Sequence, residues 1–135
     1  MTVLDTSAAV DFLLASGVAG DVEALLAREE TAAAPDLLVF EVLAVLRRDV
    51  RRGVLAPDRA RGAIDDLGDL SVELFGTLPF RDRAWELRDN FTVADALFVA
   101  LAERLREPLA TKDRRLASAA REHAGIETVE LGTAV

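Results

Sequence analysis

Four acidic residues that lie far apart along the chain occupy positions where the local pattern calls for an apolar or an ordinary capping residue. They are Asp5, Glu41, Asp95 and Asp113. Glu41 is the sharpest case, because it interrupts an otherwise apolar run over residues 37–46. On a helix its neighbours three and four positions away are apolar, so its carboxylate would be partly desolvated. An unpaired buried charge is costly, and we therefore expect a compensating cation, which would be a divalent metal ion if the fold gathers all four acids.

The residue types available as ligands restrict which metal that would be. The chain has no cysteine and one histidine, His123, which lies near the end of an expected helix. Carboxylates alone favour Mg²⁺ or Mn²⁺. A single histidine argues against a two-histidine acid–base mechanism, and Thr6 and Ser7 have no local histidine partner for a serine-hydrolase site. No glycine-rich phosphate loop is present.

Three of the four acids also have a structural explanation. Asp5 and Asp113 could each cap a following helix, and Thr92-Val93-Ala94-Asp95 has the spacing of a capping box. Only Glu41 lacks such an explanation, and its best structural alternative is a buried ion pair with an arginine. Asp11, on the first expected helix, is a weaker candidate for the same site.

Glycine and proline separate the periodic segments into alternating strands and helices. The expected strands span residues 2–5, 31–34, 72–75, 108–110 and 126–131. The expected helices span residues 7–15, 21–30, 35–53, 57–69, 79–89, 92–106 and 112–124. This alternation predicts an α/β domain with three layers, α/β/α, around a mainly parallel sheet of about four to five strands.

Ligands of open parallel sheets bind beyond the carboxyl ends of the strands. Asp5 ends the first expected strand, and Asp113 lies just past the strand at 108–110. Glu41 and Asp95 lie near the beginnings of helices that could face the same edge. One site could therefore collect all four acids.

Length and composition favour a single soluble domain spanning residues 1–135. The chain is 51% hydrophobic and 30% charged, and it has no apolar stretch long enough to cross a bilayer and no basic signal-peptide region, so we expect it in the cytoplasm. Its net charge of −8 argues against a broad nucleic-acid footprint. Basic side chains cluster at Arg47, Arg48, Arg51 and Arg52 and again at Arg114 and Arg115. A solvated helix face is the better explanation for any one of them, but as a group they are candidates for contacts with phosphate, in particular Arg47, Arg48, Arg114 and Arg115.

Four segments, taken in order, resemble the PIN-domain ribonucleases and in particular the VapC toxins of bacterial toxin–antitoxin pairs. They are Val3-Leu4-Asp5-Thr6-Ser7-Ala8, the helix with Glu41, residues 94–103 from Ala94-Asp95, and Leu109-Ala110-Thr111-Lys112-Asp113-Arg114-Arg115-Leu116. The likeness covers nearly the whole chain.

The resemblance implies a PIN-like fold in which Asp5, Glu41, Asp95 and Asp113 form the acidic quartet, with Ser7 and Thr111 as polar supports. It implies that the quartet holds one or two Mg²⁺ or Mn²⁺ ions, which activate water for attack on an RNA phosphodiester. It also implies an inhibitory VapB-like antitoxin and a homodimer that forms a heterotetramer or larger complex with it.

Two other functions stay open at this point. A receiver-like phosphoacceptor domain has a similar size and aspartates at strand ends, but it would offer adjacent acids after the first strand, whereas Asp5 has no acidic neighbour. Lys112 is a loose match to the late lysine of such a domain. A PIN fold used only for binding, without catalysis, is the second alternative.

Overall fold

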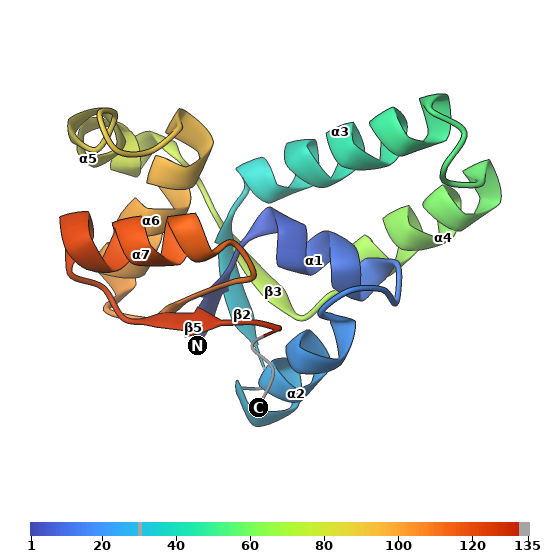
Figure 1. The fold of residues 1–135 in the computed structure, drawn as a ribbon, viewed down its shortest axis with the longest axis horizontal. Coiled ribbons are helices and arrows are strands. Elements are labelled where there is room, and N and C mark those ends of the chain that lie inside the picture. The colour runs from blue at the N-terminus through green and yellow to red at the C-terminus, as the bar shows by residue number, and fades with distance from the viewer. Residues whose placement is uncertain (30, 133–135) are drawn as a thin grey trace.

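The computed structural model describes residues 1–29 and 31–132, which are organised around a five-stranded parallel sheet (Figure 1). The strand order is β3-β2-β1-β4-β5, and every neighbouring pair is parallel. The strands are β1 (Thr2–Leu4), β2 (Ala32–Pro35), β3 (Val72–Phe75), β4 (Leu109–Thr111) and β5 (Thr128–Glu130). The predicted α/β class and parallel sheet are therefore confirmed.

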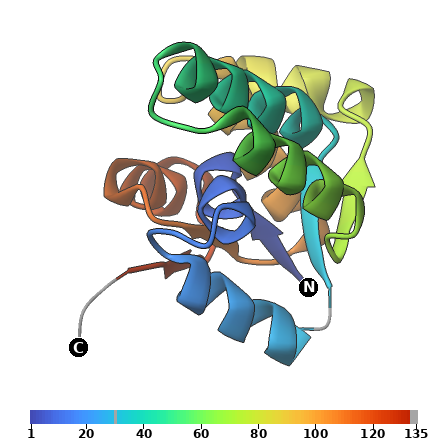
Figure 2. The same cartoon turned by 90° about the vertical axis from the view of Figure 1, so that its right-hand side faces the viewer.

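Helices cover both faces of this sheet. They are α1 (Thr6–Leu13), α2 (Ala19–Glu29), α3 (Leu37–Arg51), α4 (Pro57–Gly68), a 3₁₀ turn η1 (Leu78–Phe80), α5 (Arg81–Glu86), α6 (Val93–Leu105) and α7 (Arg114–Ala124). In Figure 1, α1, α3 and α4 lie on one side of the sheet, and α5, α6 and α7 lie on the other. Figure 2 shows α3 and α4 side by side next to α1. This arrangement is the three-layer architecture that the sequence predicted.

The central strands are apolar because helices bury both of their faces, as is usual for parallel sheets. Every residue of β1, β2 and β4 is buried, whereas the edge strands β3 and β5 are partly exposed. The small side chains of β2, Ala32-Ala33-Ala34, leave room for α6 to pack closely on the sheet. Phe98 and Leu101 of α6 fill that side of the core.

Most expected elements agree with the structure to within about two residues, the usual uncertainty of helix ends. The helix expected over residues 79–89 is wrong at both ends, because η1 precedes it and α5 ends at Glu86. Beyond that residue, Arg88 N–H and Asn90 N–H donate to carbonyls three residues back, and the chain turns to bury Leu87 and Phe91. The helix expected over 21–30 begins earlier, at Ala19, and its last residue, Glu30, lies outside the described residues.

Within residues 1–29 and 31–132, no helix is both long enough and apolar enough to span a bilayer.

Burial predicts a clear difference between two truncations of apolar side chains. Leu101 on α6 is fully buried, so Leu101→Ala should lower the free energy of unfolding by about 2–5 kcal/mol. Val54 is 73% exposed, and Val54→Ala should change the free energy of unfolding by less than about 0.5 kcal/mol. Urea denaturation of both variants measures the difference, and equal losses would contradict this description of the core.

Candidate active site

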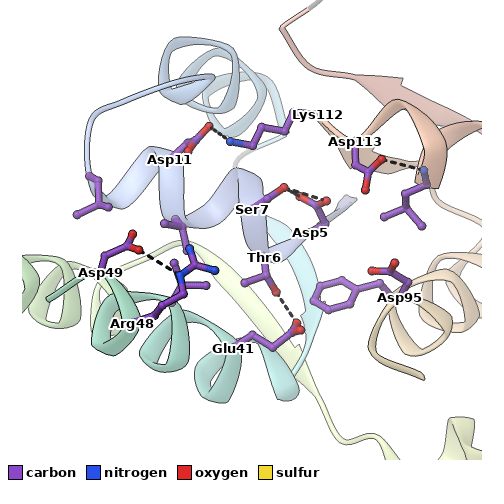
Figure 3. A pocket seen from close by; sticks show the side chains of 15 residues that line it. Asp5, Thr6, Ser7, Asp11, Glu41, Arg48, Asp49, Asp95, Lys112 and Asp113 are labelled. Atoms are coloured by element: carbon purple, nitrogen blue, oxygen red, sulfur yellow. Dashed lines mark hydrogen bonds and ion pairs between the residues drawn. The ribbon is translucent and has the colours of Figure 1, made fainter. Parts of the chain in front are cut away.

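All four acids singled out in the sequence line one cavity of about 470 Å³. Asp5 comes from the junction of β1 and α1, Glu41 from α3, Asp95 from the first turn of α6, and Asp113 from the junction of β4 and α7. Figure 3 shows their side chains around a common space. The fold therefore brings together residues separated by up to 108 positions in the sequence.

The cavity lies between β1 and β4, where the order of the strands in the sheet reverses. The chain passes from β1 to β2 on one side, and from β4 to β5 on the other, while β1 and β4 are parallel neighbours. The Asp5 N–H donates to the Ala110 carbonyl at 3.2 Å, which places the carboxyl ends of the two strands beside each other. Such a switch point opens a crevice between the diverging connections. Asp5 and Asp113 follow these two strands directly or within two residues.

Asp5 is held by neutral hydrogen-bond donors. Its carboxylate accepts from the Thr111 hydroxyl at 2.5 Å, from the Ala8 N–H at 3.0 Å and from the Ser7 hydroxyl at 3.1 Å. Ser7 and Thr111 thus take the supporting positions expected for them. Asp5 also caps α1, so its structural and site roles coexist.

Two further acids are oriented in the same way, by neutral groups. The Glu41 carboxylate accepts from the Thr6 hydroxyl at 2.6 Å. The Asp113 carboxylate accepts from the N–H groups of Arg115 and Leu116 at 2.9 and 3.2 Å and caps α7. Neutral donors fix the direction of a carboxylate without cancelling its charge.

Burial and the other three acids together raise the pKa of Asp95. Burial raises the pKa of this carboxyl, hydrogen bonding by Thr92 opposes the rise, and the charges of Asp5, Asp113 and Glu41 raise it further. The pKa of Asp5 is raised chiefly by burial, against hydrogen bonds from Thr111, Ala8 and Ser7, and Asp113 adds to the rise. The four carboxylates are thus close enough to disfavour each other's charge.

The two cations that line the cavity are bound to other acids. Arg48 Nε lies 3.1 Å from Asp49 Oδ1, and Lys112 Nζ lies 2.7 Å from Asp11 Oδ2. Among the ion pairs of residues 1–29 and 31–132, none joins a member of the quartet to a basic side chain. The buried ion pair considered for Glu41 is therefore not formed among these residues.

The donor set fits a hard divalent cation. All four candidate ligands are carboxylates, the donors that Mg²⁺ and Mn²⁺ prefer, and their mutual repulsion is what a bound cation relieves. The carboxylates of Asp5, Glu41 and Asp113 are directed by their own hydrogen bonds. Consistent with this, no three His, Asp or Glu side chains of the described residues are already grouped closely enough to hold one ion.

The structure separates the basic candidates from one another. Arg48 lines the acidic cavity, whereas Arg47 lines an apolar groove on the other side of α3. Arg114 and Arg115 are exposed at the start of α7 and are not among the residues lining the cavity. His123 packs edge-on against Phe91, far along α7 from the quartet.

Three polar or charged residues that line the cavity were not identified as site residues from the sequence. Thr6 was considered only as a nucleophile, although its position next to Asp5 made it available to a neighbouring acid. Lys112 carried a signal, because it is the only lysine of the chain and directly precedes Asp113. No sequence signal pointed to Asp49, because nothing distinguishes it from the other residues at the arginine-rich end of its helix. Asp11, the weaker candidate, does line the cavity.

Comparison with known proteins agrees with the parallel α/β domain. The sequence matches the PIN domain over residues 2–122, and the chain belongs to the PIN-domain family. It is 40% identical over 129 residues to Ribonuclease VapC12 of Mycobacterium tuberculosis, covering 96% of this chain and 99% of that protein.

Two further relatives are similar over most of their length. Ribonuclease VapC1 of Mycobacterium tuberculosis is 41% identical over 118 residues, which are 87% of this chain and 89% of that protein. VapC ribonuclease Mb0985 of Mycobacterium bovis is 36% identical over 116 residues, or 86% and 88% of the two chains. The resemblance to VapC-type PIN domains that the sequence motifs indicated is confirmed, and the match speaks against the receiver-like alternative.

The raised pKa of Asp95 predicts a pH-dependent cost in the metal-free protein. A carboxyl with a raised pKa binds its proton more tightly when folded, so its stabilising contribution is complete below the unfolded-state pKa and is lost as pH rises through the folded-state pKa. Metal-free Asp95→Asn should therefore melt at a higher temperature than wild type at pH 7. The difference should shrink towards about pH 4, near the ordinary aspartate pKa.

Thermal denaturation in EDTA across this pH range measures the effect. Asp66→Asn is a matched control, because Asp66 is exposed on α4, away from the cavity. A gain at Asp95 that equals the control, or that persists undiminished at acidic pH, would rule out charge repulsion as its cause.

Proposed function

We propose that this protein is an endoribonuclease that depends on Mg²⁺ or Mn²⁺ and acts in the cytoplasm as the VapC-type toxin of a toxin–antitoxin pair. The observation that carries the proposal is the acidic quartet, which shares one cavity and forms no ion pair with a basic side chain of the described residues. The names of the VapC relatives support the substrate class, since they describe ribonucleases. We regard residues 1–135 as one functional domain.

In this proposal Asp5, Glu41, Asp95 and Asp113 hold the metal. A bound divalent ion supplies a water of lowered pKa and a positive charge that stabilises the phosphodiester as negative charge develops on it. The chain's own contribution is preorganisation. Hydroxyls of Thr6, Ser7 and Thr111 fix the carboxylate directions, and Asp5 is 7% exposed, which limits competition from bulk water.

The RNA strand needs positive charge near an acidic cavity. Arg48 is the arginine best placed for this, because it lines the cavity wall and its side chain remains 57% exposed. Arg47, Arg114 and Arg115 are weaker candidates that would contact the strand only away from the quartet. Phosphate contacts of this kind position the strand without reading its sequence.

The α3–α4 groove is the surface we propose for a VapB-like antitoxin. Leu43, Val50 and Ile64 line it, and three arginines, Arg47, Arg51 and Arg61, surround them. The same helix, α3, places Glu41 and Arg48 in the acidic cavity, so a segment bound here is adjacent to the site. An amphipathic helix with apolar and acidic side chains fits this groove.

A homodimer is the assembly we propose, joined to antitoxin as a heterotetramer or larger complex. Leu78, Trp85 and Val93 are 72%, 65% and 63% exposed and line one hollow beside α5 and α6. Apolar and aromatic side chains gathered in this way are typical of the core of a subunit interface.

Replacing either central acid tests the nuclease proposal. Asp5→Asn and Asp95→Asn should each lower Mg²⁺-dependent cleavage of RNA at least about 100-fold, because each removes a charge needed to hold the ion, while the far-ultraviolet circular dichroism stays that of the wild type. EDTA should abolish wild-type cleavage, and Mn²⁺ or Mg²⁺ should restore it.

Asp66→Asn is again the control and should cleave as wild type does. Cleavage by Asp5→Asn at the wild-type rate would refute the assignment of the site. A folded wild-type protein that binds Mn²⁺ but cleaves no RNA would instead favour a PIN domain used only for binding.

A second prediction concerns the groove. Leu43 is 41% exposed there, so Leu43→Asp should weaken binding of the antitoxin encoded beside this protein at least about tenfold, while RNA cleavage by the free protein is retained. Val54→Asp is the control, because Val54 is 73% exposed but lies outside the groove. Binding measured by calorimetry that is equal for the two variants would place the antitoxin elsewhere.

A further inference from the structure

Lys112 is the only lysine of the chain, and its side chain lies in the wall of the acidic cavity. Its Nζ donates to Asp11 Oδ2 at 2.7 Å (Figure 3). On either side of it in the sequence are two residues of the site, Thr111, which donates to Asp5, and Asp113. A basic side chain that directly precedes a member of the quartet is therefore bound by an acid outside the quartet.

Asp11 is firmly fixed in the position from which it binds Lys112. It is 9% exposed, and its Oδ2 also accepts from the Val18 N–H at 3.1 Å. Gly17, at φ +51°, passes so close that a Cβ at this position would collide with the Asp11 carboxylate. Helix α1 and the turn that follows it thus build a rigid receptor for one ammonium group.

The quartet itself offers a competing place for that ammonium. Its four carboxylates share one cavity, the charges of the other three act against Asp95, and no basic side chain of residues 1–29 and 31–132 pairs with them. Lysine carries a compact charge on a flexible four-carbon stem. An ammonium that entered the cavity would relieve the same repulsion as a metal ion does. Metal binding would then have to displace it.

We propose that Asp11 is a positioning residue that holds Lys112 away from the metal site and so keeps the quartet available to the divalent ion. This inference rests on the proposed metal-dependent function. It differs from two simpler roles for the pair. In a purely structural brace, either partner would be needed for metal binding. If Lys112 instead bound the RNA phosphate, its loss would weaken RNA binding and leave metal affinity unchanged.

Calorimetric titration of Mn²⁺ into the full-length protein separates these roles. Asp11→Asn, which keeps an oxygen for the Val18 N–H, should weaken Mn²⁺ binding at least about fivefold, within the usual range of coupling between sites. Lys112→Met should bind Mn²⁺ as tightly as wild type or more tightly. The double variant should regain wild-type affinity, because no ammonium remains to compete.

Lys112→Met binding that is as weak as that of Asp11→Asn, with no recovery in the double variant, would overturn the inference in favour of a brace. Wild-type affinity in Asp11→Asn would also overturn it. A wild-type protein that binds neither Mn²⁺ nor Mg²⁺ would remove the proposed function as well, so the two failures are distinguishable.

The single lysine allows a direct observation of its position. Reductive ¹³C-methylation labels Lys112 and the amino terminus only, and the two give separate NMR signals. In Asp11→Asn the lysine methyl signal should move when Mg²⁺ is added, because the ion displaces the ammonium, whereas in wild type it should stay in place. If Mg²⁺ leaves the lysine signal of Asp11→Asn unchanged, the substitution altered only the overall charge of the cavity. That result would overturn the inference.

Discussion

Four carboxylates held together without a counter-charge are the constraint on which the rest of this structure depends. Such a group costs free energy on folding, and the raised pKa values of Asp5 and Asp95 record that cost. The fold meets it with an all-parallel sheet whose buried centre is rigid, and with hydroxyl and N–H donors that aim the acids but leave them charged. Locally reduced stability of this kind is common at functional sites, and it is what the proposed binding of a cation would relieve.

Charge in the cavity is divided between two sets of residues. Arg48 and Lys112, the basic side chains of the cavity, form ion pairs with Asp49 and Asp11. The quartet is therefore available to a bound ligand. This division explains how a chain of net charge −8 can present both an unpaired acidic group and basic side chains in one cavity. The overall charge of a protein is thus a poor guide to its partners when opposite charges are sorted within one cavity.

Reasoning from the sequence predicted the fold class, the parallel sheet and the strand ends that carry Asp5 and Asp113, because these follow from local periodicity and from a general property of parallel sheets. It could not predict the hydrogen bond from Thr6 to Glu41 or the ion pair between Lys112 and Asp11. Both contacts join elements whose relative placement no local pattern encodes. The short helix α5 was predicted too long for a similar reason. Burial of Leu87 and Phe91, a tertiary effect, ends that helix against its local propensity.

The hydrogen bond from Thr111 to Asp5 spans 106 residues of sequence. Strand β4, which carries Thr111, must insert beside β1 before Asp5 acquires this partner and before Asp113 reaches the cavity. During synthesis the amino-terminal half can form α1 to α4, yet it holds only Asp5 and Glu41 of the four acids. A nascent chain therefore cannot form the complete group of four acids until β4 and Asp113 have emerged from the ribosome and β4 has paired with β1.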